Sequence, residues 1–120
     1  MSDNNIHMGV IKIHSMEEFD NITQMLTPNQ GMIIDFTATW CGPCRMIAPT
    51  LDKMAETYPQ LMICKADVDE LQELTQMFDI KAMPTFVFMR IGRTEYKLEG
   101  ANKAKLAELC HKFANNEPLN

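Results

Sequence analysis

The chain has 120 residues, of which 46% are hydrophobic and 22% charged, a composition typical of one globular domain. Its net charge of −5, with no basic cluster, argues against a nucleic-acid or anionic-membrane surface. The first residues lack the basic-then-apolar order of a signal peptide, and no apolar run approaches the ~20 residues that span a bilayer. We therefore expect a cytoplasmic protein, in which a disulfide is more often catalytic than structural.

The first part of the chain is predicted to form a strand, a helix and a second strand. Residues 10–13 and 32–38 are short, mostly apolar runs, and the second has the composition of a buried central strand. Between them, Ser15 followed by Glu18 has the form of a capping box at a helix start. Apolar residues continue at helical spacing as far as Leu26, where turn residues end the helix.

A longer helix is predicted after residue 40. Its apolar stripe runs from Cys44 to Tyr58. Pro49 lies inside this stripe and predicts a kink, because proline removes one backbone hydrogen bond. A strand over 61–64 and a short helix over 71–78 are predicted to follow.

The remaining residues are predicted to form a hairpin and a final helix. Strong β-formers at 85–90 lead through the turn Ile91-Gly92-Arg93 into a second strand over 94–99. The last helix has an apolar face made of Leu106, Leu109, Cys110 and Phe113.

The order of these elements predicts the fold class. Early alternation of strands and helices implies parallel pairing, and the closing hairpin adds an antiparallel part. We therefore expect a mixed sheet in one three-layer α/β domain over residues 1–120, with frayed termini at 1–8 and 115–120.

Two cysteines at the start of the long helix are the strongest functional signal. Trp40-Cys41-Gly42-Pro43-Cys44 follows a predicted strand and precedes a predicted helix, a placement typical of a reversible dithiol/disulfide pair. Zinc sites share the Cys-x-x-Cys spacing. Tetrahedral zinc needs two further ligands, however, and Cys64, Cys110 and the histidines form no second paired motif. We therefore expect no metal.

The chain resembles the thioredoxin family over residues 10–113. The motifs that carry the resemblance are Trp40-Cys41-Gly42-Pro43-Cys44, Ala82-Met83-Pro84-Thr85-Phe86 and Gly100-Ala101. The inner Gly-Pro resembles thioredoxins proper, since protein disulfide isomerases usually have Gly-His and glutaredoxins Pro-Tyr. Thr37 departs from bacterial members, which often have a second Trp there. The resemblance implies a thioredoxin fold, with a mixed sheet flanked by four helices, and a general protein-disulfide reductase that maintains cell redox homeostasis.

The two thiols are expected to act in sequence. Cys41 lies at the predicted helix start, where unpaired N–H groups and the helix dipole stabilise a thiolate, so we expect it to attack a substrate disulfide. Cys44 lies one turn further in and is expected to be more buried and to resolve the mixed disulfide. Gly42 permits close approach of the substrate, and Pro43 stiffens the loop. The resemblance implies that Pro43 also raises reducing power.

Asp35 is the exception in an apolar strand. An ionised carboxylate is costly in a core, so we expect a raised pKa and a group able to exchange a proton near neutral pH. The resemblance assigns this proton transfer to the pair of Asp35 and Cys44. It also assigns Lys65, on a neighbouring strand, as the charge partner of Asp35. The alternatives are an exposed strand carboxylate for Asp35 and a solvated lysine at a strand end for Lys65.

The resemblance further implies a substrate-binding surface. It predicts a cis bond before Pro84 and a Met83 backbone that pairs with an extended substrate by β-augmentation. Trp40, Gly42, Pro43, Met83, Gly100 and Ala101 would complete a flat apolar surface, although a lone Trp could instead be a core aromatic.

No bound cofactor is expected, because the electrons travel in the Cys41–Cys44 pair. The resemblance implies an NADPH-dependent thioredoxin reductase as donor. It implies peroxiredoxins, methionine sulfoxide reductases and ribonucleotide reductase as acceptors, and a monomer. A partner-binding module in which turnover is secondary is the main alternative. An oxidising or isomerising role is disfavoured by the inner Gly-Pro and by the lack of a signal-peptide pattern.

The other two cysteines need a separate interpretation. Cys64 lies in an apolar strand and Cys110 on the apolar face of the last helix, so both are expected to be small buried hydrophobes. Regulatory oxidation or mixed-disulfide formation is the alternative.

Overall fold

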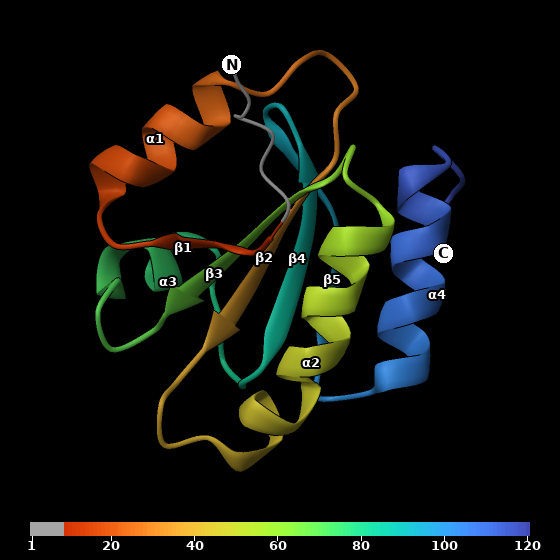
Figure 1. The fold of residues 1–120 in the computed structure, drawn as a ribbon. Helices are drawn as coiled ribbons and strands as arrows, with labels where there is room; N and C mark the ends of the chain where they lie inside the picture. Colours follow the sequence, from red (N-terminus) through yellow and green to blue (C-terminus); the bar gives the residue numbers. More distant parts are fainter. Residues whose placement is uncertain (1–8) are drawn as a thin grey trace.

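The computed structural model describes residues 9–120 and places nine helices and strands there in the predicted order (Figure 1). The strands are β1 (Ile11–Ile13), β2 (Met32–Thr37), β3 (Met62–Asp67), β4 (Thr85–Arg90) and β5 (Arg93–Glu99). The helices are α1 (Met16–Gln24), α2 (Gly42–Thr57), α3 (Gln72–Met77) and α4 (Lys103–Ala114). The predicted frayed N-terminus, 1–8, lies outside the described residues.

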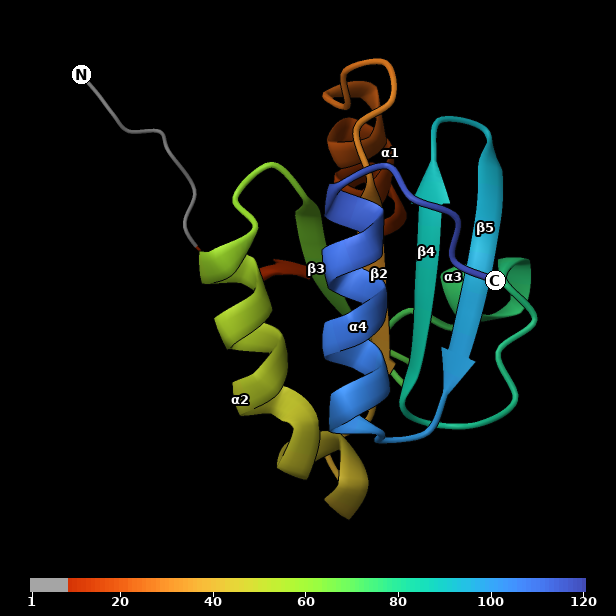
Figure 2. The ribbon, with the colours of Figure 1, turned by 90° about the vertical axis from the view of Figure 1, so that its right-hand side faces the viewer.

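The five strands form one mixed sheet in the order β1-β3-β2-β4-β5. β1, β3 and β2 run parallel, and β4 pairs antiparallel with both β2 and β5, as the element order predicts. α1 and α3 cover one face of the sheet, and α2 and α4 lie side by side on the other (Figures 1 and 2). The predicted three-layer α/β arrangement is confirmed.

β2 is the central strand and is buried on both faces. Residues 32–36 are all buried, as the apolar run predicts. Ile33 packs in the core under α2 and α4, whereas Ile34 and Phe36 pack in the core under α1 and α3. Because side chains alternate along a strand, Asp35 points to the same face as Ile33, toward α2.

β3 is longer than predicted. Its predicted end was residue 64, but the strand continues through Lys65 and Ala66, which pair with both β1 and β2, to Asp67, which pairs with β2. Their pairing partners are far away in the sequence, so local hydrophobicity does not mark this extension. The extension places Lys65 directly beside Asp35 in the register of β2 and β3.

α1 begins as predicted but with a modified cap. Ser15 is the N-cap residue, and its hydroxyl accepts a hydrogen bond from the Glu18 N–H at 3.1 Å. In a reciprocal capping box the Glu18 carboxylate would accept from the Ser15 N–H. Here it accepts from the His14 N–H at 2.8 Å, one residue earlier.

α2 runs without interruption from Gly42 through Pro49 to Thr57. Its axis changes direction between its first turns and the remainder, in agreement with the predicted kink (Figure 2). The residues that it buries, Cys44, Ile47, Leu51 and Met54, are those of the predicted stripe.

The C-terminal end differs from the prediction of a frayed segment at 115–120. Leu119 is only 5% exposed and belongs to the core under α2 and α4. The Asn116 N–H donates to Phe113 O, and the Glu117 N–H donates to Lys112 O, so the backbone stays ordered beyond α4. A single apolar residue in a polar tail has no periodicity from which this burial could be predicted.

Candidate active site

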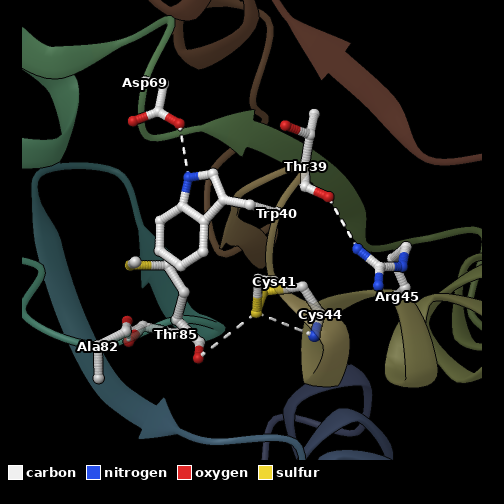
Figure 3. The surroundings of a disulfide bond; sticks show 9 residues. Thr39, Trp40, Cys41, Cys44, Arg45, Asp69, Ala82 and Thr85 are labelled. Carbon is white, nitrogen blue, oxygen red and sulfur yellow. Dashed lines mark hydrogen bonds between the residues drawn. A yellow bond between two sulfur atoms is a disulfide. The ribbon is translucent and has the colours of Figure 1, made fainter.

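The two cysteines lie where β2 leads into α2 at one end of the sheet (Figures 1 and 3). Cys41 is the N-cap residue of α2, with an extended backbone, and Pro43 occupies the first turn. Cys41 and Cys44 form a disulfide, with their Cα atoms 5.3 Å apart. The structure therefore shows the oxidised form of the predicted redox pair.

The Cys41 sulfur is close to two backbone groups. It accepts a hydrogen bond from the Cys44 N–H at 3.2 Å, and it lies 3.9 Å from Met83 O. The N–H groups of the first helical turn have no partner within the helix, so they and the helix dipole stabilise negative charge at this atom. Cys44 was expected to be more buried than Cys41. In the oxidised form the two residues are almost equally buried, with Cys41 5% and Cys44 3% exposed.

Two side-chain contacts hold the segment before Cys41 (Figure 3). The Trp40 indole N–H donates to Asp69 Oδ2 at 2.9 Å, and Arg45 donates from Nη1 to Thr39 O at 2.8 Å. Trp40 is 64% exposed, which excludes the alternative of a core aromatic. Asp69 and Arg45 were not predicted as site residues. No sequence spacing connects Asp69 with Trp40, and the hydrogen bond of Arg45 to a backbone carbonyl does not depend on a residue type that the sequence would reveal.

The residues before β4 meet the cysteines, as predicted. The Met83–Pro84 bond is cis, and Met83 packs against a small cluster of Ala38, Cys41 and Cys44. Pro84 itself is buried, so its ring is not part of an exposed surface.

The residues after β5 lie at the same end of the sheet as the cysteines. The Gly100 N–H donates to Pro84 O at 2.8 Å, and Gly100 has a positive φ of 96°, a conformation that glycine adopts readily. Ala101 is half-buried against the core. At Gly42 a Cβ would meet nothing closer than Arg45 Nη2 at 4.0 Å, so internal packing does not require glycine there.

Asp35 is a buried carboxyl group beneath α2. It is 1% exposed, and neither carboxylate oxygen has a hydrogen-bond partner among residues 9–120. Burial raises its pKa to about 7, and the nearby positive charge of Lys65 opposes that rise. Lys65 is the register partner of Asp35 on β3 and is half-buried, but the two form no ion pair. The expected raised pKa is confirmed.

Comparison with known proteins identifies the family. The thioredoxin family model matches residues 10–112. An H-type thioredoxin of rice, Oryza sativa subsp. indica, is 44% identical over 81% of this chain and 80% of its own length. Thioredoxin 1 of Plasmodium falciparum is 40% identical over 85% of this chain and 95% of its own. The chain belongs to the thioredoxin family.

Solved thioredoxins have the same fold. The Plasmodium falciparum thioredoxin structure superposes with a TM-score of 0.79 at 40% identity, covering 86% of this chain and 98% of that one. The Malassezia sympodialis thioredoxin gives a TM-score of 0.81 at 34% identity, covering 94% and 97%. A structure concerning thiol resolution of a yeast mitochondrial 1-Cys peroxiredoxin by the glutathione and thioredoxin systems gives 0.73 at 37% identity, covering 82% and 91%.

Membership of the thioredoxin family establishes the general activity. The chain is a protein-disulfide oxidoreductase of the thioredoxin type, and its own Cys41–Cys44 disulfide carries the redox chemistry, as in other thioredoxins. Proteins of this family interact with a thioredoxin reductase and with disulfide substrates. Within residues 9–120, no helix is long and apolar enough to cross a membrane.

The remaining cysteines of this thioredoxin are buried, as predicted. Cys64 and Cys110 are free thiols with 0% exposure, and burial raises the pKa of each to about 12. Cys64 packs in the core under α1 and α3, and Cys110 in the core under α2 and α4. The sheet therefore separates them from each other.

Proposed function

We propose that this thioredoxin reduces protein disulfides in the cytoplasm, with Cys41 as the attacking thiol and Cys44 as the resolving thiol. The observation that carries the assignment is the position of the Cys41 sulfur. It caps the start of α2 and accepts the Cys44 N–H, so the same contact can stabilise a thiolate after reduction.

The reaction proceeds in two exchanges. The Cys41 thiolate attacks one sulfur of the substrate disulfide, forming a mixed disulfide and releasing the other substrate sulfur as a thiolate. The Cys44 thiol loses its proton and attacks Cys41, forming the Cys41–Cys44 disulfide and releasing the second substrate sulfur. Two electrons have then passed from the protein to the substrate, and a thioredoxin reductase must return them.

Asp35 is the group that we propose accepts the Cys44 proton. A pKa raised to about 7 lets the carboxyl group both accept and return a proton near neutral pH. Its two oxygens have no partner among the described residues, so no internal hydrogen bond has to break first. Lys65, the register partner, favours the charged form and thereby limits the rise in the pKa of Asp35.

Substrate binding is proposed at the surface around Trp40. Trp40 and Pro43 are exposed, Met83 is half-buried beside the disulfide, and Gly100 and Ala101 lie at the same end of the sheet. An extended substrate segment could pair with the Met83 backbone by β-augmentation. Pro84 is buried, so we propose that it contributes to substrate binding through the backbone conformation of this segment and not through direct contact.

The proposed donor is an NADPH-dependent thioredoxin reductase. The proposed acceptors are peroxiredoxins, methionine sulfoxide reductases and ribonucleotide reductase, and the yeast structure connected with a 1-Cys peroxiredoxin supports the first of these. We propose that the protein acts as a monomer in electron transport and needs no bound cofactor.

The test of the thiol assignment is reduction of insulin disulfides by NADPH through a thioredoxin reductase. We expect turnover in the wild type, a loss of more than about 1,000-fold in Cys41→Ser, and wild-type turnover in the matched Cys64→Ala variant. If the wild type shows no turnover although its dithiol is confirmed as reduced, the protein is instead a partner-binding module.

The role of Asp35 is tested by stopped-flow kinetics of Asp35→Asn. An asparagine cannot accept the Cys44 proton, so we expect resolution of the mixed disulfide to slow by about 10- to 100-fold at neutral pH while the first attack changes little. Equal slowing of both steps would show that Asp35 acts on the site as a whole and not as the base for Cys44.

A further inference from the structure

A pocket of about 460 Å³ lies behind the disulfide, between β1, β3 and the first turns of α2. Its lining includes Lys12 from β1, Lys65 from β3, and Cys44 and Arg45 from α2. Arg45 and Trp40 lie on opposite sides of the disulfide in Figure 3. The pocket therefore borders Cys44 on the Arg45 side, whereas the proposed substrate surface lies on the Trp40 side.

Three positively charged side chains line this pocket without a balancing ion pair. Lys12 and Lys65 are directly opposite each other in the parallel register of β1 and β3, so their side chains leave the same face of the sheet. Like charges placed directly opposite on neighbouring strands repel each other. Neither lysine, nor Arg45, has an ion pair with an acidic side chain in the part of the chain that the structure describes.

The two acidic residues of the pocket have other contacts. Asp67 accepts the Asp69 N–H through Oδ1 at 2.8 Å. Glu70 Oε2 lies 3.3 Å from Nδ1 of His14, the residue after β1. The pocket thus combines three cations with two carboxylates, and the carboxylates do not neutralise the cations by direct contact.

Arg45 is already oriented for binding. Its Nη1 donates to Thr39 O at 2.8 Å, which fixes the guanidinium at the pocket and leaves its other N–H groups without a hydrogen-bond partner in residues 9–120. A planar guanidinium with free N–H groups matches the oxygen spacing of an oxyanion, and an ammonium adds a mobile donor.

We propose that this pocket binds a small oxyanion, with Lys12, Lys65 and Arg45 as its ligands. An anion between the two lysines removes their mutual repulsion and accepts charge-assisted hydrogen bonds from all three side chains. Its net stabilisation is limited because the pocket is open to solvent and two carboxylates are nearby, so binding is expected in the millimolar range.

Binding would also regulate the proposed active site. Lys65 favours the ionised form of Asp35, and a bound anion offsets that charge. The pKa of Asp35 should therefore rise when the pocket is occupied, so that more of the carboxyl group is protonated at neutral pH. This consequence extends the proposed function, whereas binding itself does not depend on it.

The experiment is an NMR titration of the ¹⁵N-labelled protein with inorganic sulfate, against sodium chloride at matched ionic strength. Sulfate stays dianionic throughout the titration range of Asp35, so the same probe serves for both measurements. We expect saturable shifts at the backbone N–H groups of Lys12, Lys65 and Arg45. Lys12→Gln should weaken binding by about 10-fold or more.

Lys53→Gln is the matched control. Lys53 is exposed on α2 and does not line the pocket. The Lys53→Gln variant therefore loses one positive charge, as Lys12→Gln does, but keeps all three proposed ligands. Equal weakening in Lys12→Gln and Lys53→Gln, or shifts that chloride reproduces, would show general screening and overturn the site. The pKa of Asp35, followed by ¹³C NMR of its carboxyl group, should rise with sulfate. Saturable binding that leaves this pKa unchanged would overturn the placement of the anion against Lys65.

Discussion

The four cysteines form two groups in opposite surroundings. Cys41 and Cys44 lie at the start of α2, where the Cys41 sulfur accepts a backbone N–H. Cys64 and Cys110 lie on either side of the sheet in apolar cores, and burial raises the pKa of each to about 12. All four are buried residues, so exposure does not separate the two groups.

The difference is the presence of hydrogen-bond donors aimed at the sulfur. Burial alone disfavours a thiolate, because the charged form loses its hydration. At a helix start the unpaired N–H groups and the helix dipole replace part of that hydration. We therefore expect thiol chemistry at the start of α2 and much lower reactivity of the other two sulfurs.

Alkylation of the reduced protein by iodoacetamide at pH 7 should show the difference between the two groups of cysteines most strongly. A thiol with a pKa of about 12 is a thiolate in a fraction of about 10⁻⁵ at this pH, whereas an unperturbed cysteine is so in a few per cent. We expect Cys41 to react more than about 1,000-fold faster than Cys64 and Cys110, as measured by peptide mass spectrometry.

The denatured protein is the control for this labelling, since all four cysteines should then react at similar rates. Modification of Cys64 or Cys110 in the native state within about 10-fold of the rate of Cys41 would contradict the expected difference in reactivity between the two groups of cysteines. It would mean that the core opens often enough to expose them.

Burial also raises the pKa of Asp35, as it does for Cys64 and Cys110, but here the positive charge of Lys65 opposes the rise. A folded-state pKa of about 7, above the ordinary value of 3.8, gives stability that is fully present below pH 3.8 and is lost as the pH rises through 7. The loss is at most about 4 kcal/mol.

Asp35→Asn should remove this pH dependence. We expect the variant to become more stable than the wild type by about 2–4 kcal/mol above pH 7, and the difference to vanish below pH 4. Urea unfolding of the oxidised proteins at a series of pH values measures it. Asp20→Asn, which changes an exposed carboxylate on α1, should follow the wild-type curve. Curves for wild type and Asp35→Asn that stay parallel would contradict a raised pKa at Asp35.

Local patterns predicted most of the fold and the centre of the site. The helical stripes of α2 and α4 and the apolar run of β2 are visible in the sequence because period and composition are local properties. Asp35 could be found for the same reason, since a carboxylate in an apolar strand breaks the local pattern. The juxtaposition of Met83 with Cys41 was predicted only through the resemblance to a known family.

Contacts between distant residues could not be predicted in this way. The extension of β3 depends on two neighbouring strands, and the burial of Leu119 depends on a core built from the whole chain. The hydrogen bond from Trp40 to Asp69 joins two loops that are distant in the sequence, and no motif predicts their contact. The opposition of Lys12 and Lys65 likewise requires the strand register.

Cys64→Ala and Cys110→Ala should change stability and activity only slightly. Each removes a buried sulfur, which costs about 1 kcal/mol of stability, and neither should change insulin reduction by more than about 2-fold. Serine at either position should cost about 1–3 kcal/mol more than alanine, because its hydroxyl enters an apolar core without a partner.

The double variant tests whether the two sulfurs are independent. Because the sheet separates Cys64 from Cys110, the losses in the free energy of unfolding should add within about 0.5 kcal/mol. A shortfall or excess beyond that would mean that the two cores are coupled through the sheet. A loss of activity in either alanine variant with its stability intact would mean that a buried cysteine takes part in the reaction. The two pairs of cysteines, Cys41 with Cys44 and Cys64 with Cys110, would then differ in their location in the fold but not in whether they react.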